Sequence, residues 1–102
     1  MLTLLFILTL LRLDMIEKEV SVKNRAGLHT RPAAALVKLA AKFKSDIYLI
    51  RDGFPINGKS IIGVMTLAAE QGCKLTLKTE GEDEGAAMNA LCDLFDAGFG
   101  EL

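Results

Sequence analysis

The period of the hydrophobic pattern switches between two and about 3.6 residues along this chain, and the order of the switches limits the folds it can adopt. Apolar and polar residues alternate over residues 16–22 and 74–79, which predicts half-buried β-strands. The segments DIYLIR (residues 46–51) and FPIN (residues 54–57) are separated by Asp-Gly, a signal typical of a β-hairpin. Pro55 has no N–H to donate, so the second strand of this hairpin should lie at an edge of the sheet.

Three helices are expected between and after these strands. Apolar residues recur three and four positions apart over residues 30–42 and again within residues 80–100, which predicts helices with one apolar stripe. A short helix is expected within residues 58–72, with Ser60 as its N-cap and Gly72 just beyond its end. The predicted order is therefore β-α-β-β-α-β-α. Strands with one apolar face and helices with one apolar stripe pack as two layers.

Length and charge narrow the class of function. The chain has 102 residues, enough for one small domain. Its 12 Lys and Arg residues against 13 Asp and Glu residues give a net charge of −1, so we expect no nucleic-acid partner. Cys73 and Cys92 have neither metal-ligand spacing nor a nearby histidine, and no metal or other cofactor is expected. We interpret them as reduced packing residues of a cytoplasmic protein, because a disulfide framework, the alternative, needs oxidising surroundings.

The first fourteen residues, MLTLLFILTLLRLD, differ in character from the rest of the chain. This apolar run is shorter than the 20 or so residues that span a membrane, so no membrane insertion is expected. It also lacks the basic start and small-residue cleavage site of a secretory signal. Met15 follows at once. We interpret residues 1–14 as dispensable or as lying upstream of a true start at Met15, with a weak membrane-binding or partner-binding segment as the alternative. The folded domain is then residues 15–102.

The only histidine of the chain, His29, lies where the first helix should begin. Gly27 allows a tight turn before it, and Pro32 suits the first helical turn. Free backbone N–H groups at a helix start form an anion site, to which Thr30 and Arg31 would contribute. A neutral imidazole is a nucleophile, so this arrangement suits the acceptance of a phosphoryl group. On the residues alone, a surface histidine at a helix end by chance remains the alternative.

Two motifs at a fixed separation point to a known family. GLHTRPAA, residues 27–34, resembles the active-site motif of the HPr family, the histidine-containing phosphocarrier proteins of the bacterial phosphoenolpyruvate:sugar phosphotransferase system. INGKSIIGVMTLAA, residues 56–69, resembles the regulatory-serine segment of that family, and EGEDE, residues 80–84, resembles its entry to the last helix. The resemblance covers residues 15–102. It implies an α+β fold, a two-layer open-faced sandwich in which three helices cover one face of a four-stranded antiparallel sheet.

The resemblance also implies roles for individual residues. His29 would accept phosphate on Nδ1 from phospho-enzyme I and pass it to the A component of an enzyme II sugar permease. Arg31 would neutralise phosphoryl oxygens, beside the backbone cradle of Thr30 and Arg31. An HPr kinase/phosphorylase would modify Ser60, since the chain has no phosphate-binding loop of its own. The expected partner contacts, on a monomeric cytoplasmic carrier, are Ile61, Ile62 and Met65.

Two other readings stay open beside this one. A regulatory member of the family, for instance in a nitrogen-related branch, would use the same phosphorylation for signalling and move no sugar. A pure interaction module would signal through Ser60 without phosphate on His29. An enzyme with its own substrate is disfavoured, because no second general acid or base lies near His29 along the chain.

Overall fold

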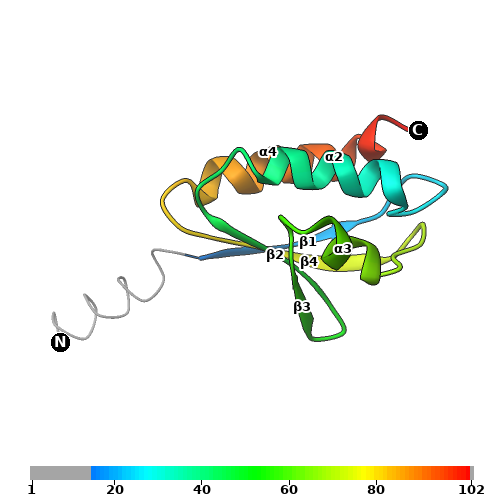
Figure 1. The fold of residues 1–102 in the computed structure, drawn as a ribbon, viewed down its shortest axis with the longest axis horizontal. Helices are drawn as coiled ribbons and strands as arrows, with labels where there is room; N and C mark the ends of the chain where they lie inside the picture. The colour runs from blue at the N-terminus through cyan, green and yellow to red at the C-terminus, as the bar shows by residue number, and fades with distance from the viewer. Residues whose placement is uncertain (1–14, 102) are drawn as a thin grey trace, which may run out of the picture.

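The computed structural model describes residues 15–101, and Figure 1 shows them as a sheet with helices on one side. The predictions for residues 1–14 concern residues outside this range. The elements follow the predicted order, with a short 3₁₀ helix added at the end: β1 (Ile16–Ser21), α2 (Thr30–Ala40), β2 (Asp46–Arg51), β3 (Phe54–Asn57), α3 (Ile61–Thr66), β4 (Lys74–Glu80), α4 (Glu84–Asp96) and η1 (Gly98–Gly100).

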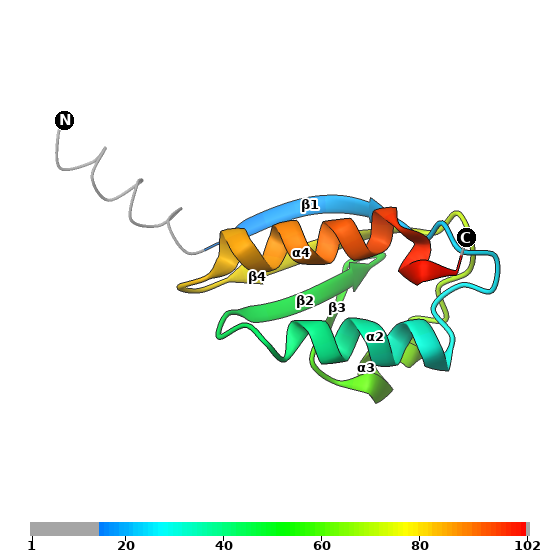
Figure 2. The same ribbon diagram turned by 90° about the horizontal axis from the view of Figure 1, so that it is seen from above.

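The four strands form one antiparallel sheet in the order β1-β4-β2-β3. The register places Val20 opposite Leu75 and Leu49 opposite Leu77, so that buried side chains line up on the face below α2 and α4. β3 is an edge strand, which confirms the placement predicted from Pro55. The predicted open-faced sandwich is confirmed, with α3 packed beside α2 and β3 (Figure 2).

The core lies between the sheet and the apolar stripes of α2 and α4. Both stripes follow the predicted spacing, and the two cysteines are free and pack at the margin of the core. The largest fully buried side chains are those of Phe95, Leu36, Ile47, Leu49, Leu75, Leu77, Met88, Leu91, Val22 and Val64.

The short helix α3 ends earlier than the sequence predicts. The pattern of residues 58–72 indicates a helix that continues toward Gly72, but α3 stops at Thr66. Ala68 adopts a left-handed φ of 48°, which turns the chain out of the helix. The guanidinium of Arg51 donates to the carbonyl oxygens of Leu67 at 2.8 Å and of Ala68 at 3.1 Å. Arg51 thus binds the carbonyls at the end of α3 and fixes the loop that follows.

The first helix is also slightly shorter than predicted, and it ends at Ala40 instead of continuing to residue 42. Lys42 N–H and Phe43 N–H donate to the carbonyls of Leu39 and Ala40, which tightens the last turn. The side chain of Lys59 then donates to the Phe43 carbonyl at 2.7 Å. The chain is thereby turned into β2.

Asp83 joins the loop before β2 to the start of α4. Its carboxylate accepts hydrogen bonds from the backbone N–H groups of Lys44 and Ser45, at 2.9 Å each, and from the Ser45 hydroxyl. The Ser45 hydroxyl, followed by these N–H groups, lowers the pKa of Asp83 from 3.8 to about 2. A carboxyl whose pKa is depressed in the folded chain stabilises the fold above its unfolded pKa, and the stabilisation is lost as pH falls.

We therefore expect Asp83→Asn to make the fold less stable at pH 7 and to flatten its acid sensitivity between about pH 4 and pH 2. Urea unfolding at pH 7, 4, 3 and 2 measures both effects. Asp93→Asn, at an exposed position of α4, is the matched control. Equal loss of stability on acidification in the parent and in Asp83→Asn would contradict the role given to this carboxylate.

None of the helices within residues 15–101 has the length and apolar character that crossing a bilayer requires.

Candidate functional site

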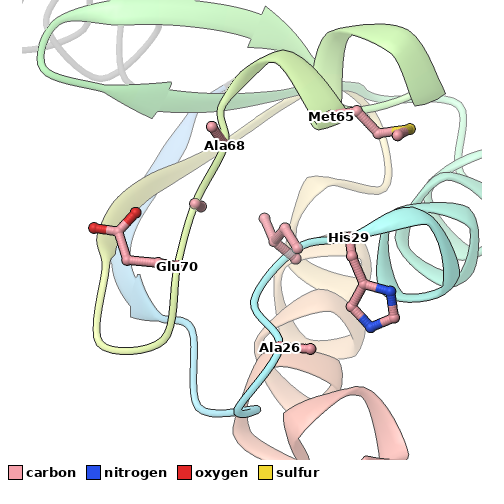
Figure 3. A pocket seen from close by; sticks show the side chains of 7 residues that line it. Ala26, His29, Met65, Ala68 and Glu70 are labelled. Carbon is pink, nitrogen blue, oxygen red and sulfur yellow. The ribbon is translucent and has the colours of Figure 1, made fainter.

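His29 is the N-cap of α2, as the sequence predicts. Its backbone is extended, with φ −76° and ψ −172°, and its carbonyl accepts the first helical hydrogen bond from Ala33 N–H at 3.0 Å. The side chain makes no capping hydrogen bond, and 43% of it is exposed. The imidazole therefore projects from the helix start and is partly open to solvent (Figure 3).

The loop before His29 is held against the segment that follows α3. The Leu28 N–H donates to the Ala69 carbonyl at 2.8 Å, and the Leu28 side chain is buried. Gly27 has a φ of +74°, and a Cβ there would lie 2.5 Å from the Ala69 oxygen. Both the backbone angle and the close approach require glycine. The position of His29 thus depends on contact between two loops about 40 residues apart in sequence.

Gly27→Ala should shift this loop and weaken phosphoryl acceptance, and it should lower the unfolding free energy by more than about 1 kcal/mol. Gly53→Ala is a close control, because Gly53 has a φ of +83° but nothing within 4 Å of an added Cβ. The difference between the two variants isolates the contact with Ala69. Chemical denaturation and a phosphorylation assay measure it, and equal behaviour of both variants would show that the contact is unimportant.

The first turn of α2 provides the predicted anion-binding groups. Thr30 and Arg31 are exposed and precede the first intrahelical donor, Ala33, so their N–H groups remain available to a ligand. Pro32 is buried and has no N–H to lose. This turn contains no acidic residue, and no carboxylate of residues 15–101 lies within ion-pair distance of Arg31. The helix start and the Arg31 charge therefore favour an anion bound at this turn.

Glu101 is the residue of this site that sequence reasoning missed. Its Oε1 lies 3.1 Å from Nε2 of His29 and 3.1 Å from Nδ2 of Asn24. Figure 2 shows the reason, since η1 returns the chain to the loop before α2. Burial alone would raise the pKa of Glu101. Hydrogen bonds from His29 and Asn24 and the charges of His29 and Arg31 lower this pKa by more than burial raises it, so the net shift is downward. No local sequence pattern links Glu101 with a histidine 72 positions earlier.

A carboxylate on Nε2 has a direct chemical consequence. An ionised carboxylate only accepts hydrogen bonds, so the ring nitrogen that contacts it carries the proton. In the neutral imidazole the other nitrogen, Nδ1, then keeps its lone pair. The geometry therefore favours Nδ1 as the nucleophile, with Glu101 placed to stabilise positive charge that develops on the ring.

Ser60 and the apolar residues after it lie on the short helix α3. The Ser60 side chain accepts from Gly63 N–H at 3.1 Å, which confirms the predicted N-cap. Ile61, Ile62 and Met65, the predicted partner contacts, are 37%, 74% and 42% exposed. We call these three residues the α3 patch. Val64 and Leu67, by contrast, belong to the core.

One residue of the α3 patch, Met65, shares a surface pocket with the histidine. Met65, from α3, and His29, from the loop before α2, both line this pocket, and Ala68 and Glu70 line it from the segment after α3 (Figure 3). A partner that covers this pocket would touch His29 and Met65 together. Within residues 15–101, no group of three or more His, Cys, Asp or Glu side chains is placed to hold a metal ion.

Comparison with known proteins shows similarity to HPr and HPr-like proteins. The family model described as "PTS HPr component phosphorylation site" matches residues 16–97, from the start of β1 to the end of α4. The phosphocarrier protein HPr of Treponema pallidum (strain Nichols) is 51% identical over 87 residues, which cover 85% of this chain and 99% of that protein. The HPr-like protein Crh of Halalkalibacterium halodurans is 51% identical over 77 residues, or 76% and 92% of the two chains.

Solved structures agree with this comparison. The crystal structure of HPr-C-His from Thermoanaerobacter tengcongensis superimposes with a TM-score of 0.82 at 45% identity, covering 85% of this chain and 98% of that one. A structure of an HPr dimer from the same organism gives a TM-score of 0.67 at 44% identity, over 80% and 94% of the chains.

Proposed function

The chain belongs to the HPr family of phosphocarrier proteins, and on this premise we propose that Nδ1 of His29 accepts a phosphoryl group from phospho-enzyme I and passes it to the A component of an enzyme II sugar permease. The observation that carries the proposal is the open imidazole at the start of α2, with Glu101 on its other nitrogen. The protein is a covalent carrier in the cytoplasm and, on this proposal, it does not catalyse a reaction on a substrate of its own.

The proposed transfer step uses the groups around His29. Nδ1 attacks the phosphorus of phospho-enzyme I, a new P–N bond forms, and the bond from phosphorus to the donor atom of enzyme I breaks, with its electron pair left on enzyme I. Positive charge develops on the imidazole, and the Glu101 carboxylate lies within 3.1 Å of Nε2 to stabilise it. The N–H groups of Thr30 and Arg31 and the Arg31 guanidinium stabilise the phosphoryl oxygens. The A component then accepts the group by the reverse chemistry.

The α3 patch is the proposed contact surface for enzyme I and for the A component. Its side chains are exposed and apolar, and one of them, Met65, lines the pocket that contains His29, so docking there would exclude water around the reacting nitrogen. Ser60, at the start of the same helix, is the proposed target of an HPr kinase/phosphorylase. We propose that the working unit is a monomer, because one chain contains the whole site.

A second candidate is regulation without sugar transport. The 51% identity with a protein named HPr-like protein Crh supports it, and in that case phosphorylation of His29 or Ser60 would report a metabolic state. Intact-mass measurement after incubation with phosphoenolpyruvate and enzyme I tests the carrier proposal. We expect one added phosphoryl group that is acid-labile and base-stable. An unchanged mass would contradict the proposal and leave the Ser60 reading.

Arg31→Ala is expected to slow transfer at least about tenfold, because a cation aimed at developing oxyanion charge is lost. The unfolding free energy should stay within about 0.5 kcal/mol of the parent, as for exposed residues generally. Lys38→Ala, at the other end of α2, is the control for loss of one exposed charge. Initial rates of phosphorylation together with thermal unfolding check both points. A large loss of stability with normal transfer would give Arg31 a structural role instead.

A further inference from the structure

Asn24 is a fully buried polar residue in the loop before His29, and its environment is unusual. Its exposed fraction is 0%, and its side-chain Nδ2 donates both hydrogens within the site. One reaches the Gly27 carbonyl at 2.7 Å, and the other reaches Oε1 of Glu101 at 3.1 Å. The amide therefore connects the loop that carries His29 with the end of the chain that carries Glu101.

The other end of the same amide has no partner among residues 15–101. Asn24 Oδ1 is buried and accepts no hydrogen bond there. A buried unpaired acceptor is unfavourable for folding. Reversing the amide would place its oxygen against two acceptors, so the observed orientation is fixed by Gly27 and Glu101. The unpaired Oδ1 makes Asn24 unfavourable for stability. Its presence is better explained by the two groups that Nδ2 holds, the Gly27 carbonyl and the Glu101 carboxylate.

Glu101 itself needs a constraint, because its contact with His29 is weak on its own. The His29–Glu101 pair alone joins a 43% exposed side chain to a 17% exposed one, and exposed ion pairs are individually weak. Asn24 donates to the same carboxylate oxygen that contacts Nε2 of His29. Its amide is anchored on the turn in which Gly27 N–H donates to the Asn24 carbonyl at 3.2 Å. Asn24 thereby holds the Glu101 carboxylate in a fixed position relative to the loop that carries His29.

We propose that Asn24 is a positioning residue of the phosphoryl-accepting site: its amide holds the Glu101 carboxylate on Nε2 of His29, and this fixes the tautomer and the ring orientation that leave Nδ1 free. The statement about transfer rests on the proposed function, whereas the statement about the tautomer does not. Asn24 touches neither the phosphoryl group nor the reacting nitrogen, and it acts only through Glu101 and the turn at Gly27.

The test measures the tautomer directly. His29 is the only histidine, so the two ring nitrogens of the ¹⁵N-labelled full chain are assigned without ambiguity. At a pH where the ring is neutral, we expect the ratio of the Nε2–H to the Nδ1–H tautomer to fall about twofold to fivefold in Asn24→Ala, the range of a partly exposed charged pair. The rate of phosphorylation by enzyme I should fall by a similar factor. Asn89→Ala, which removes an exposed amide on α4, should change neither quantity.

A double-mutant cycle separates positioning from general damage to the fold. Glu101→Ala alone should lower the tautomer ratio at least as much as Asn24→Ala does, and the double variant should match Glu101→Ala. Effects that multiply, or an unchanged ratio in Asn24→Ala, would overturn the proposal. If Asn24→Ala does not fold, the Asn24 side-chain amide is followed in Glu101→Ala: its resonance should shift and its hydrogens should exchange faster, and an unaffected amide would also overturn it. A further outcome is that the tautomer ratio changes in the variants while enzyme I phosphorylates neither the parent nor any variant. In that case the carrier proposal fails, and the role of Asn24 in positioning Glu101 on His29 stands.

Discussion

Replacement of His29 by alanine is expected to abolish phosphoryl acceptance and to leave the fold intact. The side chain makes no capping hydrogen bond, is 43% exposed and contributes nothing to the core, so the unfolding free energy should change by less than about 1 kcal/mol. The chemistry, by contrast, has no substitute, since the chain contains no other imidazole. We expect labelling of the His29→Ala variant, with phosphoenolpyruvate and enzyme I, to fall to the background seen when enzyme I is left out.

Two further measurements test whether His29 itself carries the label. Glu101→Ala removes the contact on Nε2 but keeps Nδ1, so it should slow labelling without abolishing it. Acid treatment should release the label from the parent, because a phosphoramidate is acid-labile. If His29→Ala is labelled as well as the parent, another residue accepts the phosphate and the proposed mechanism is wrong.

The sequence predicts those parts of this site that depend on neighbours along the chain. Gly27, His29 and Pro32 lie within six residues, and their conformational preferences place the imidazole at a helix start. The N-cap role of Ser60 is local in the same sense, because its partner Gly63 lies three residues away. Hydrophobic periodicity likewise yields the order of strands and helices, since it is a property of short segments.

What the sequence does not predict are contacts that close only when distant segments meet. Glu101 reaches His29 across 72 positions, and Asp83 reaches Ser45 across 38. The early end of α3 has the same origin, because the Arg51 guanidinium comes from a neighbouring strand and binds carbonyls that a longer helix would have used internally. Apolar residues after Thr66 continue the helical pattern, so periodicity alone could not locate the break.

For the α3 patch, neither the sequence nor the structure shows which partner it contacts. Ile61, Ile62 and Met65, the predicted partner contacts, are exposed, whereas Val64 of the same helix is buried. A six-residue helix cannot bury every apolar side chain that it carries, so exposure alone follows from geometry. The role of these residues in partner contact stays a prediction, and it is the premise of the regulatory experiment on Ser60.

Ser60→Asp is expected to stay folded and to accept phosphate from enzyme I much more slowly. Aspartate is as good an N-cap as serine, and the Gly63 N–H at 3.1 Å from the serine oxygen remains available to a carboxylate. The new charge, however, adjoins Ile61 and Ile62, from which a docking partner must displace water. Removing water from a charge is unfavourable. We expect the apparent Michaelis constant for the carrier to rise at least about tenfold, which corresponds to about 1.4 kcal/mol.

Three companion variants separate regulation from capping. Ser60→Ala should transfer normally and lose about 1 kcal/mol of unfolding free energy, the usual contribution of an N-cap. Asn89→Asp adds the same charge at an exposed position of α4 and should leave transfer unchanged, which controls for net charge. Phosphorylated Ser60, with about −1.5 to −2 charges, should inhibit more than aspartate does.

The salt dependence of these rates decides between repulsion and blocked docking. Screening shortens the range of exposed charges, so inhibition by repulsion should weaken between low and moderate ionic strength. Inhibition through the desolvation of a charge inside the contact surface is local and should persist, and because Ser60 directly precedes the α3 patch we expect most of the effect to remain. If Ser60→Asp accepts phosphate as fast as the parent at both ionic strengths, Ser60 is a helix cap alone, and the α3 patch is not the surface through which His29 is reached.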